Sequence, residues 1–307
     1  LVTAHGLARV MRDRFSPKVL YPAIAALLLA NTINAGADIG AIAASVNLLV
    51  PVPIPILIVP ITVAIIALLV IGSYRLIVST FKWLTLALFG YVGASILAKP
   101  NVAEVLRGTF IPTLSADTAF LATLVAILGT NISPYLFFWQ ASEEIEDQKS
   151  KRMTVNIRRR RSQQALDSDL NKARWDTIIG MLFSNFAVYF VNVAAAATLF
   201  QVDRTGLQSA AEAAAALRPL AGDAAFALFA IGLAGSGFLS VPILASSSAY
   251  AAADVFGWRT GLGLKLNQAR LFYGVIIVSM LVGMLVNFLG ISPITALFWS
   301  AVINGLL

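Results

Sequence analysis

Eight long apolar segments determine what this chain of 307 residues can fold into. A helix needs about 20 apolar residues to cross the roughly 30 Å hydrocarbon core of a bilayer, and each segment approaches or exceeds that length. Backbone polar groups inside the bilayer must be paired within the protein, which favours helices. We therefore predict an all-α, polytopic membrane protein. The segments are Leu20–Val50, Ile54–Gly72, Trp83–Ala98, Thr118–Ala141, Thr177–Phe200, Ala224–Ala252, Leu271–Gly290 and Ile291–Leu307.

Composition supports the membrane assignment and removes several classes of function. Only 12% of the residues are charged, about half of the roughly 25% that is usual in soluble domains. The sequence has no cysteine and a single histidine, His5, which excludes disulfide scaffolds, thiolate metal sites and Ser–His–Asp catalysis. It also lacks a phosphate-binding glycine-rich loop. We therefore expect a protein that is not an enzyme and that holds no resident cofactor.

The basic residues indicate how the segments are oriented. All but four of the 22 Lys and Arg residues fall on one side of the membrane if the first segment runs from inside to outside. Because Lys and Arg near spans are retained in the cytoplasm, that side is predicted to be cytoplasmic. Topology thus explains the net charge of +7, and we expect no nucleic-acid partner. A cytoplasmic loop is predicted over about residues 143–175, where a basic run can contact anionic lipid.

We interpret residues 1–307 as one transmembrane domain. The chain begins at Leu1 without a signal sequence and stops inside an apolar run at Leu307, so we expect it to be a piece of a longer protein, truncated at both ends. A run of small residues between Gly232 and Ser248 in the sixth segment is expected to serve close helix packing. An ion site there is the alternative.

A carboxylate lies well inside the first apolar segment. Asp38 follows Asn31 and Asn34 at spacings of three and four residues, so the three side chains share one helical face. An intramembrane carboxylate is costly unless it faces water, a cation or a partner. We therefore expect Asp38 to line a cation or proton pathway. The alternatives are a buried acid with a structural partner and a polar seam that joins helices.

The fourth segment carries a predicted break. Gly129–Pro134 combines a glycine, three side chains that compete for backbone hydrogen bonds, and a proline that lacks an N–H group. In transporters, helices broken near the midplane use unpaired carbonyls to bind ions or substrate. Thr130, Asn131 and Ser133 could supply hard oxygen ligands, which suit Mg²⁺, Ca²⁺ or Mn²⁺. A simple proline kink is the alternative.

Three stretches together resemble the natural resistance-associated macrophage protein (Nramp) family of divalent metal transporters, and more narrowly a bacterial Nramp-related branch. They are ANTINAGADIG at 30–40, GTNISPYLFFWQASEE at 129–144 and FLGISPITALFWSAVING at 288–305. The resemblance implies a leucine-transporter-type fold of two inverted five-helix repeats, with the metal held between two broken helices. The eight segments then correspond to the family's helices three to ten. The first broken helix, with the main metal-binding Asp and Asn, would precede Leu1.

The sequence departs from the family pattern at the second broken helix. Thr130 stands where an alanine carbonyl binds the metal, and Ser133 stands where the family has a metal-binding Met. Tyr135 and Gln140 replace two histidines. The resemblance therefore implies a harder, more hydrated metal site of Thr130, Asn131 and Ser133, with Mg²⁺ as a candidate substrate beside Mn²⁺.

The same register implies an ion pathway. Asp38 matches a family acid, but Ala41 replaces the acid that usually follows one turn later, which weakens the case for proton symport. Arg270 is a candidate partner for Asp38. The residues that we assign to the pathway are Asp38, Tyr135, Gln140 and Asn304.

These observations predict alternating-access transport of divalent metal cations across a membrane, expected to be the bacterial inner (plasma) membrane. The metal ion is the substrate, and the lipid bilayer surrounds the protein, with no obligate protein partner evident. One alternative is a carrier of amino acids or organic cations with the same fold, because fold alone does not fix the substrate. The other is a passive cation channel.

Overall fold

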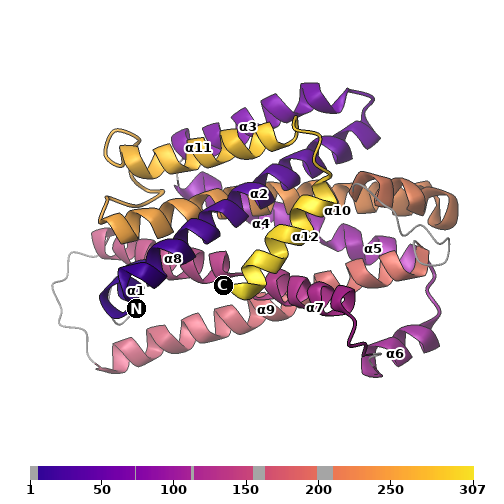
Figure 1. Ribbon diagram of the computed structural model, residues 1–307, viewed down its shortest axis with the longest axis horizontal. Coiled ribbons are helices and arrows are strands. Elements are labelled where there is room, and N and C mark those ends of the chain that lie inside the picture. The colour runs from indigo at the N-terminus through magenta and orange to yellow at the C-terminus, as the bar shows by residue number, and fades with distance from the viewer. Residues whose placement is uncertain (1–5, 73, 112–113, 155–162, 199–209) are drawn as a thin grey trace.

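The computed structural model describes the chain except for residues 1–5, 73, 112–113, 155–162 and 199–209. Helices account for all the regular structure of the described residues (Figure 1). In chain order they are α1 (Leu7–Arg14), α2 (Pro17–Leu49), α3 (Ile54–Ile71), α4 (Tyr74–Ala87), α5 (Phe89–Leu97), α6 (Val102–Phe110), α7 (Thr118–Asn131), α8 (Pro134–Thr154), α9 (Gln163–Thr198), α10 (Ala210–Phe256), α11 (Arg270–Val286) and α12 (Pro293–Leu306).

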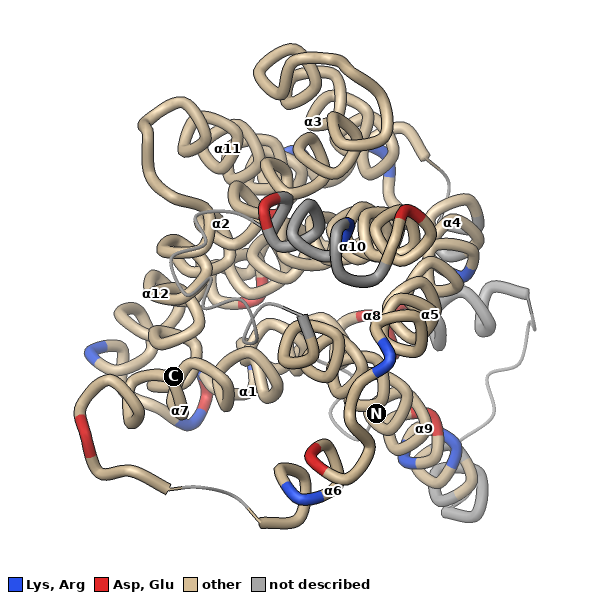
Figure 2. The backbone as a smooth tube through the Cα atoms, turned by 90° about the vertical axis from the view of Figure 1, so that its right-hand side faces the viewer, with Lys and Arg blue, Asp and Glu red and all other residues tan. Residues whose placement is uncertain are grey.

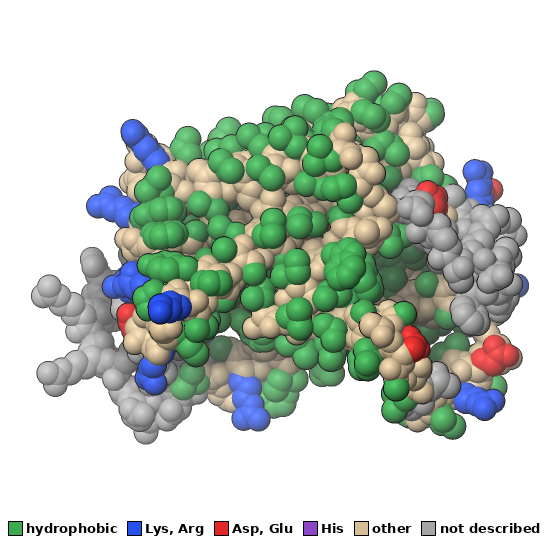
Figure 3. Space-filling model, in the orientation of Figure 1, with side chains coloured by type: hydrophobic (Ala, Val, Ile, Leu, Met, Phe, Trp, Pro, Cys, Tyr) green, Lys and Arg blue, Asp and Glu red, His purple; other side chains and the backbone are tan. Residues whose placement is uncertain are grey.

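The helices confirm an all-α, polytopic membrane protein. Within the described residues, six helical stretches are long and apolar enough to cross a bilayer, and α11 and α12 are shorter apolar helices. Large apolar side chains cover the outside of the molecule (Figure 3), including Ile71, Trp83 and Leu182, each at least 67% exposed. Such an exterior suits contact with lipid tails and would be a liability in water.

Helices α2 and α10 form the centre of the bundle. They pack along each other, and α11, α12, α5 and α4 lie around them. Close approach depends on small residues: a Cβ on Gly36 of α2 would lie 2.3 Å from the Gly283 carbonyl oxygen of α11, and one on Gly237 of α10 would lie 2.5 Å from Ile42. Because hydrophobic burial gives no preference for protein over lipid, this close packing holds the helices together.

Several helices depart from straight spans, as their sequences suggest. Pro60 lies inside α3, and a turn at Leu88 separates α4 from α5. Helix α10 contains a non-helical residue, Gly222, with φ of 86° and ψ of 173°. A positive φ of this kind is accessible to glycine without steric cost, so Gly222 divides a shorter helical part, which begins at Ala210, from the long span that follows.

The predicted cytoplasmic loop of residues 143–175 contains the ends of two helices. Helix α8 continues to Thr154 and α9 begins at Gln163, so both ends of that stretch are helical. The remaining residues, 155–162, contain the Arg158–Arg161 run and lie outside the described residues. Hydropathy marks where a chain leaves the bilayer, whereas backbone hydrogen bonds continue a helix beyond that point, which explains the difference.

The segments that we assign to the cytoplasm gather at one end of the molecule. Helix α1, the end of α8, the beginning of α9 and the turn between α10 and α11 lie together there, whereas α6 and the beginning of α7 lie at the opposite end (Figure 1). Along the long axis the helices are seen as a bundle in which charged residues are sparse (Figure 2). This arrangement agrees with the orientation expected from the basic residues.

Candidate functional site

The broken helix is present where the sequence predicts it. Helix α7 ends at Asn131, and α8 begins at Pro134. The amide of Ile132 still donates to the Leu128 carbonyl oxygen at 2.8 Å, but Pro134 has no N–H group with which to continue the ladder. The chain therefore changes direction at residues 132 and 133, inside the apolar stretch Thr118–Glu146.

The outer end of α7 is capped before this stretch enters the bilayer. Asp117 accepts the Phe120 amide at 2.8 Å, which is the usual role of an N-cap carboxylate. The Ser115 hydroxyl also donates to Asp117. These hydrogen bonds lower the pKa of the Asp117 carboxyl, so the cap stays ionised at neutral pH. The cap fixes where α7 starts and thereby where its broken end falls.

Ser133 shapes the break. Its side chain is 2% exposed, and its Oγ lies 2.5 Å from the Gly129 carbonyl oxygen and 3.0 Å from that of Thr130. A hydroxyl has one proton to donate and keeps two lone pairs. The Ser133 oxygen can therefore close the end of α7 and still accept a donor or bind a cation.

Thr130 and Asn131 use their donors in the same way. The Thr130 hydroxyl donates to the Ala126 carbonyl oxygen at 2.9 Å, and the Asn131 amide nitrogen donates to that of Ile127 at 2.9 Å. The amide oxygen of Asn131 and the lone pairs of Thr130 are acceptors only. The three predicted metal ligands follow one another at the break, where Thr130 is exposed and Ser133 is buried, and each has a neutral oxygen atom.

Helix α12 approaches this break very closely. A Cβ on Gly129 would lie 2.0 Å from the Ala301 carbonyl oxygen, and one on Gly305 would lie 2.5 Å from the Val125 carbonyl oxygen. Asn304 precedes Gly305 on α12, and its side chain is 3% exposed. Its Oδ1 has no hydrogen-bond partner in the described part of the chain. A buried amide oxygen without a donor is costly, and such groups commonly serve water or an ion.

A line of polar contacts, which we call the polar seam, runs between α2, α10 and α12. Asp38 accepts from the Ser240 hydroxyl at 2.5 Å, and Asn31 donates to the Ser248 hydroxyl at 3.0 Å. Asn34 accepts from the Ser300 hydroxyl. The three α2 residues therefore share one face, as the spacing predicts, and each has a partner on a neighbouring helix.

Tyr135 of α8 is hydrogen-bonded to a helix of the polar seam, whereas Gln140 is not. The Ser247 hydroxyl of α10 donates to the Tyr135 carbonyl oxygen at 2.8 Å, whereas Gln140 donates to the Thr177 hydroxyl of α9 at 2.7 Å. Of the residues assigned to the pathway, the structure thus places Asp38, Tyr135 and Asn304 around α2, α10 and α12. Gln140 lies on another side of α8. The bond from Ser240, and not one from Arg270, partners Asp38 in the described residues.

The serines of α10 are the residues that sequence reasoning missed. The run of small residues was expected to serve packing, yet Ser240, Ser247 and Ser248 all bond to α2 or α8. A signal was present, because Ser236, Ser240 and Ser247 recur at helical spacing on one face. Ser236 also bonds to the Tyr91 hydroxyl at 3.1 Å.

Acidic or sulfur-rich metal clusters do not contribute to this site. Among the residues described, no group of three or more His, Cys, Asp and Glu side chains is placed to hold a metal ion. The polar atoms at the break and in the seam are hydroxyl, amide and carbonyl oxygens with one carboxylate, Asp38. A cation held here would keep part of its hydration shell, which suits hard divalent ions.

The fold and the site together define a class of protein. Apolar helices with a lipid-facing exterior, one of them broken inside the bilayer beside a polar seam, are the architecture of a polytopic membrane transporter. The family model for natural resistance-associated macrophage protein-like (Nramp) proteins matches residues 1–307. The chain therefore belongs to the Nramp family, which implies transport of divalent metal ions by an integral, multi-pass membrane protein rather than enzymatic catalysis.

Proposed function

We propose that Thr130, Asn131 and Ser133 contribute oxygen ligands for a hard divalent cation, Mg²⁺ or Mn²⁺, that the protein carries across the bacterial plasma membrane. The observation that carries this proposal is Ser133. It is buried at the break of a membrane helix and presents an oxygen where a thioether would favour softer metals. The only histidine of the sequence, His5, lies outside the described residues.

The way α8 is attached supports our proposal of alternating access. Residues 132 and 133 separate it from α7, so α8 can pivot there while α2 and α10 keep their close packing. Movement of α8 would expose the oxygen ligands to the cytoplasmic side in one state and cover them in the other. Asn304 and Asp38 would line the path that the hydrated ion follows.

Coupling to protons is not required by this arrangement. Asp38 is bonded to Ser240, and Ala41 and Gln140 offer no titratable group. We therefore propose that the cation moves down its own electrochemical gradient. Proton symport would have to use Asp38, the one carboxylate of the polar seam, or titratable groups elsewhere in the protein.

Divalent uptake into proteoliposomes tests the proposal. With the full-length protein we expect Mg²⁺ and Mn²⁺ uptake rates within about tenfold of each other, unchanged by an imposed pH gradient. Uptake of Mn²⁺ alone, driven by protons, would contradict both the hard site and the uncoupled mechanism. Flux of amino acids instead of metal would favour the organic-substrate carrier, and unitary currents in planar bilayers would favour a channel.

A substitution at Ser133 tests whether this residue binds the metal or only supports the fold. Ser133→Met restores a thioether, and we expect it to raise the Mn²⁺ to Mg²⁺ uptake ratio about tenfold or more. Ser79→Met is the matched control, because Ser79 is exposed on α4 and should leave the ratio unchanged. An unchanged ratio in Ser133→Met protein that still transports would remove Ser133 from the ligand set.

A further inference from the structure

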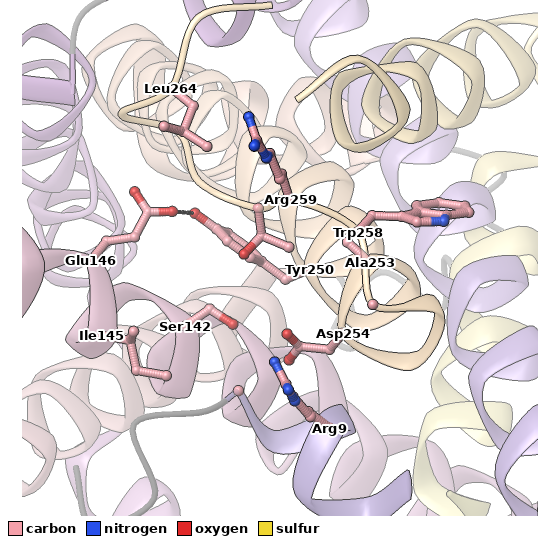
Figure 4. A pocket seen from close by; sticks show the side chains of 13 residues that line it. Arg9, Ser142, Ile145, Glu146, Tyr250, Ala253, Asp254, Trp258, Arg259 and Leu264 are labelled. Atoms are coloured by element: carbon pink, nitrogen blue, oxygen red, sulfur yellow. Dashed lines mark hydrogen bonds between the residues drawn. The ribbon is translucent and has the colours of Figure 1, made fainter. Parts of the chain in front are cut away.

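Near its cytoplasmic end, α8 is attached to α10 and to the turn after α10 through the carboxylate of Glu146. Glu146 accepts from the Tyr250 hydroxyl of α10, from the Leu262 amide at 2.9 Å and from the Gly263 amide at 3.3 Å. Figure 4 shows the Glu146 carboxylate directed at the Tyr250 hydroxyl from the opposite wall of a pocket. We call this group of four residues the Glu146 knot. Hydrogen bonds to a carboxylate are among the stronger ones in proteins.

The turn that donates hydrogen bonds to Glu146 is itself hydrogen-bonded to α11. Leu262 and Gly263 belong to the turn between α10 and α11, and the Tyr273 hydroxyl of α11 donates to the Leu264 carbonyl oxygen of the same turn at 2.7 Å. Tyr250 and Tyr273 are 2% and 1% exposed. The knot therefore joins α8 to a body formed by α10, the turn and α11.

Glycine at position 261 lets the carboxylate approach the turn. Its φ is +145°, and a Cβ there would lie 3.0 Å from Glu146 Oε1. A larger residue would be strained by the backbone conformation and would press on the carboxylate. The turn is thus shaped to present two successive N–H groups to an anion, and the anion that it receives is the side chain of α8.

Glu146 lies far along α8 from the break, so a small rotation of α8 at the break would move Glu146 by a large distance. At 1.5 Å per residue, Glu146 lies about 18 Å along the helix from Pro134. The side of α8 next to the knot borders a cavity of about 270 Å³ between α1, α8, α10 and the turn. Ser142 of α8 is 6% exposed and lines this cavity. The cavity leaves room for α8 to shift without overlapping packed side chains.

We propose that the Glu146 knot is a latch that holds α8 against the α10–α11 body and must open before the cation can leave toward the cytoplasm. The proposal rests on the transport function proposed above, because it assigns a step of that cycle to α8. With the latch closed, both ends of α8 are fixed to α10, by Ser247 at Tyr135 and by Tyr250 at Glu146. With it open, α8 is free to pivot at residues 132 and 133.

Thiol labelling measures the latch without requiring transport. Residues 1–307 contain no cysteine, so once any cysteine outside them is replaced, Ser142→Cys places a single thiol on the side of α8 that lines the cavity. In full-length protein we expect slow modification by a water-soluble maleimide from the cytoplasmic side. Glu146→Gln should raise that rate about tenfold, which corresponds to about 1.4 kcal/mol. Tyr250→Phe keeps the ring and should raise the rate by a smaller factor, about threefold.

Two controls distinguish a latch from general loosening. Glu144→Gln changes an acid two residues away on α8, about 200° around the helix, and should leave the rate unchanged. Ser279→Cys reports on α11, where Ser279 is 8% exposed, and its labelling should not respond to Glu146→Gln. If Glu146→Gln protein does not fold, Tyr250→Phe decides the test alone.

The outcomes for the latch and for the transport function are separable. Equal Ser142→Cys labelling with and without Glu146→Gln and Tyr250→Phe, in folded protein, would overturn the latch even if metal uptake is observed. A parallel rise at Ser279→Cys would also overturn it, since the substitution would then act by global destabilisation. Faster labelling at Ser142→Cys alone, in protein that transports no divalent metal, would support the attachment of α8 by the knot but refute both the transport function and the role of the knot in cation release.

Discussion

Ser240 of α10 donates a hydrogen bond to Asp38 and so stabilises a carboxyl group inside the bilayer. The two atoms lie 2.5 Å apart, and removal of the hydroxyl would leave a carboxyl oxygen without its donor. We expect Ser240→Ala to destabilise the protein by about 1–3 kcal/mol. Unfolding free energies of the two single variants and the double variant with Asp38→Asn can be measured by denaturation in detergent. The double-mutant cycle should give a coupling energy of about 1 kcal/mol. Additive effects of the two substitutions would mean that Asp38 is satisfied by another group.

The sequence predicts one side of this contact and not the other. Asn31, Asn34 and Asp38 lie at helical spacing within one segment, so their common face follows from local geometry alone. Their partners Ser240 and Ser248 are 202 and 217 residues away in the chain. Which helices meet is decided by packing of the whole bundle, which one sequence does not reveal. The same limit applies to Gln140, whose partner Thr177 lies on α9.

At the level of the helices, contact between α7 and α12 depends on two glycines. A Cβ on Gly129 would lie 2.0 Å from the Ala301 carbonyl oxygen, and the backbones would have to separate to accept it. We expect Gly129→Ala to lower stability by about 1–3 kcal/mol, as overpacking usually does, and to slow metal uptake because the break would move. Thermal unfolding in detergent and proteoliposome uptake measure the two effects.

Gly274→Ala is the matched control for Gly129→Ala. Gly274 lies in the second turn of α11, and a Cβ there would meet no atom within 4 Å. Alanine is the better helix former, so this substitution should be neutral or slightly stabilising. Equal loss of stability in both variants would show that glycine is needed in these helices for a reason other than contact between α7 and α12.

Helices were easier to predict than their ends. The break at residues 132 and 133 follows from Gly129, the polar run and Pro134, each of which weakens the backbone ladder for a chemical reason. The apolar segments end at Ala141 and begin again at Thr177, whereas α8 continues to Thr154 and α9 begins at Gln163, because apolar composition stops at the membrane surface and the helices do not. A hydropathy pattern therefore locates the membrane-spanning segments, whereas the length of each helix is determined by its backbone hydrogen bonds.

Over the whole molecule, the fold is consistent with the orientation that the basic residues predict. The alternation of basic segments was read from the sequence alone, and the structure brings those segments to one end of the bundle (Figure 1). Lys and Arg side chains mark both ends in the space-filling view, with the apolar belt between them (Figure 3). The Glu146 knot lies at the end that carries α1 and the turn after α10, so orientation decides which gate it could hold.

Side-specific labelling of single cysteines tests this orientation. Lys265, exposed in the turn between α10 and α11, is expected to face the cytoplasm, and Arg107, exposed on α6, is expected to face outward. In whole cells an impermeant maleimide should modify Arg107→Cys and should modify Lys265→Cys only after permeabilisation. Cells that express the cysteine-free chain give the background. The reverse pattern would contradict the orientation and move the Glu146 knot to the outer surface, where it could control only entry from outside.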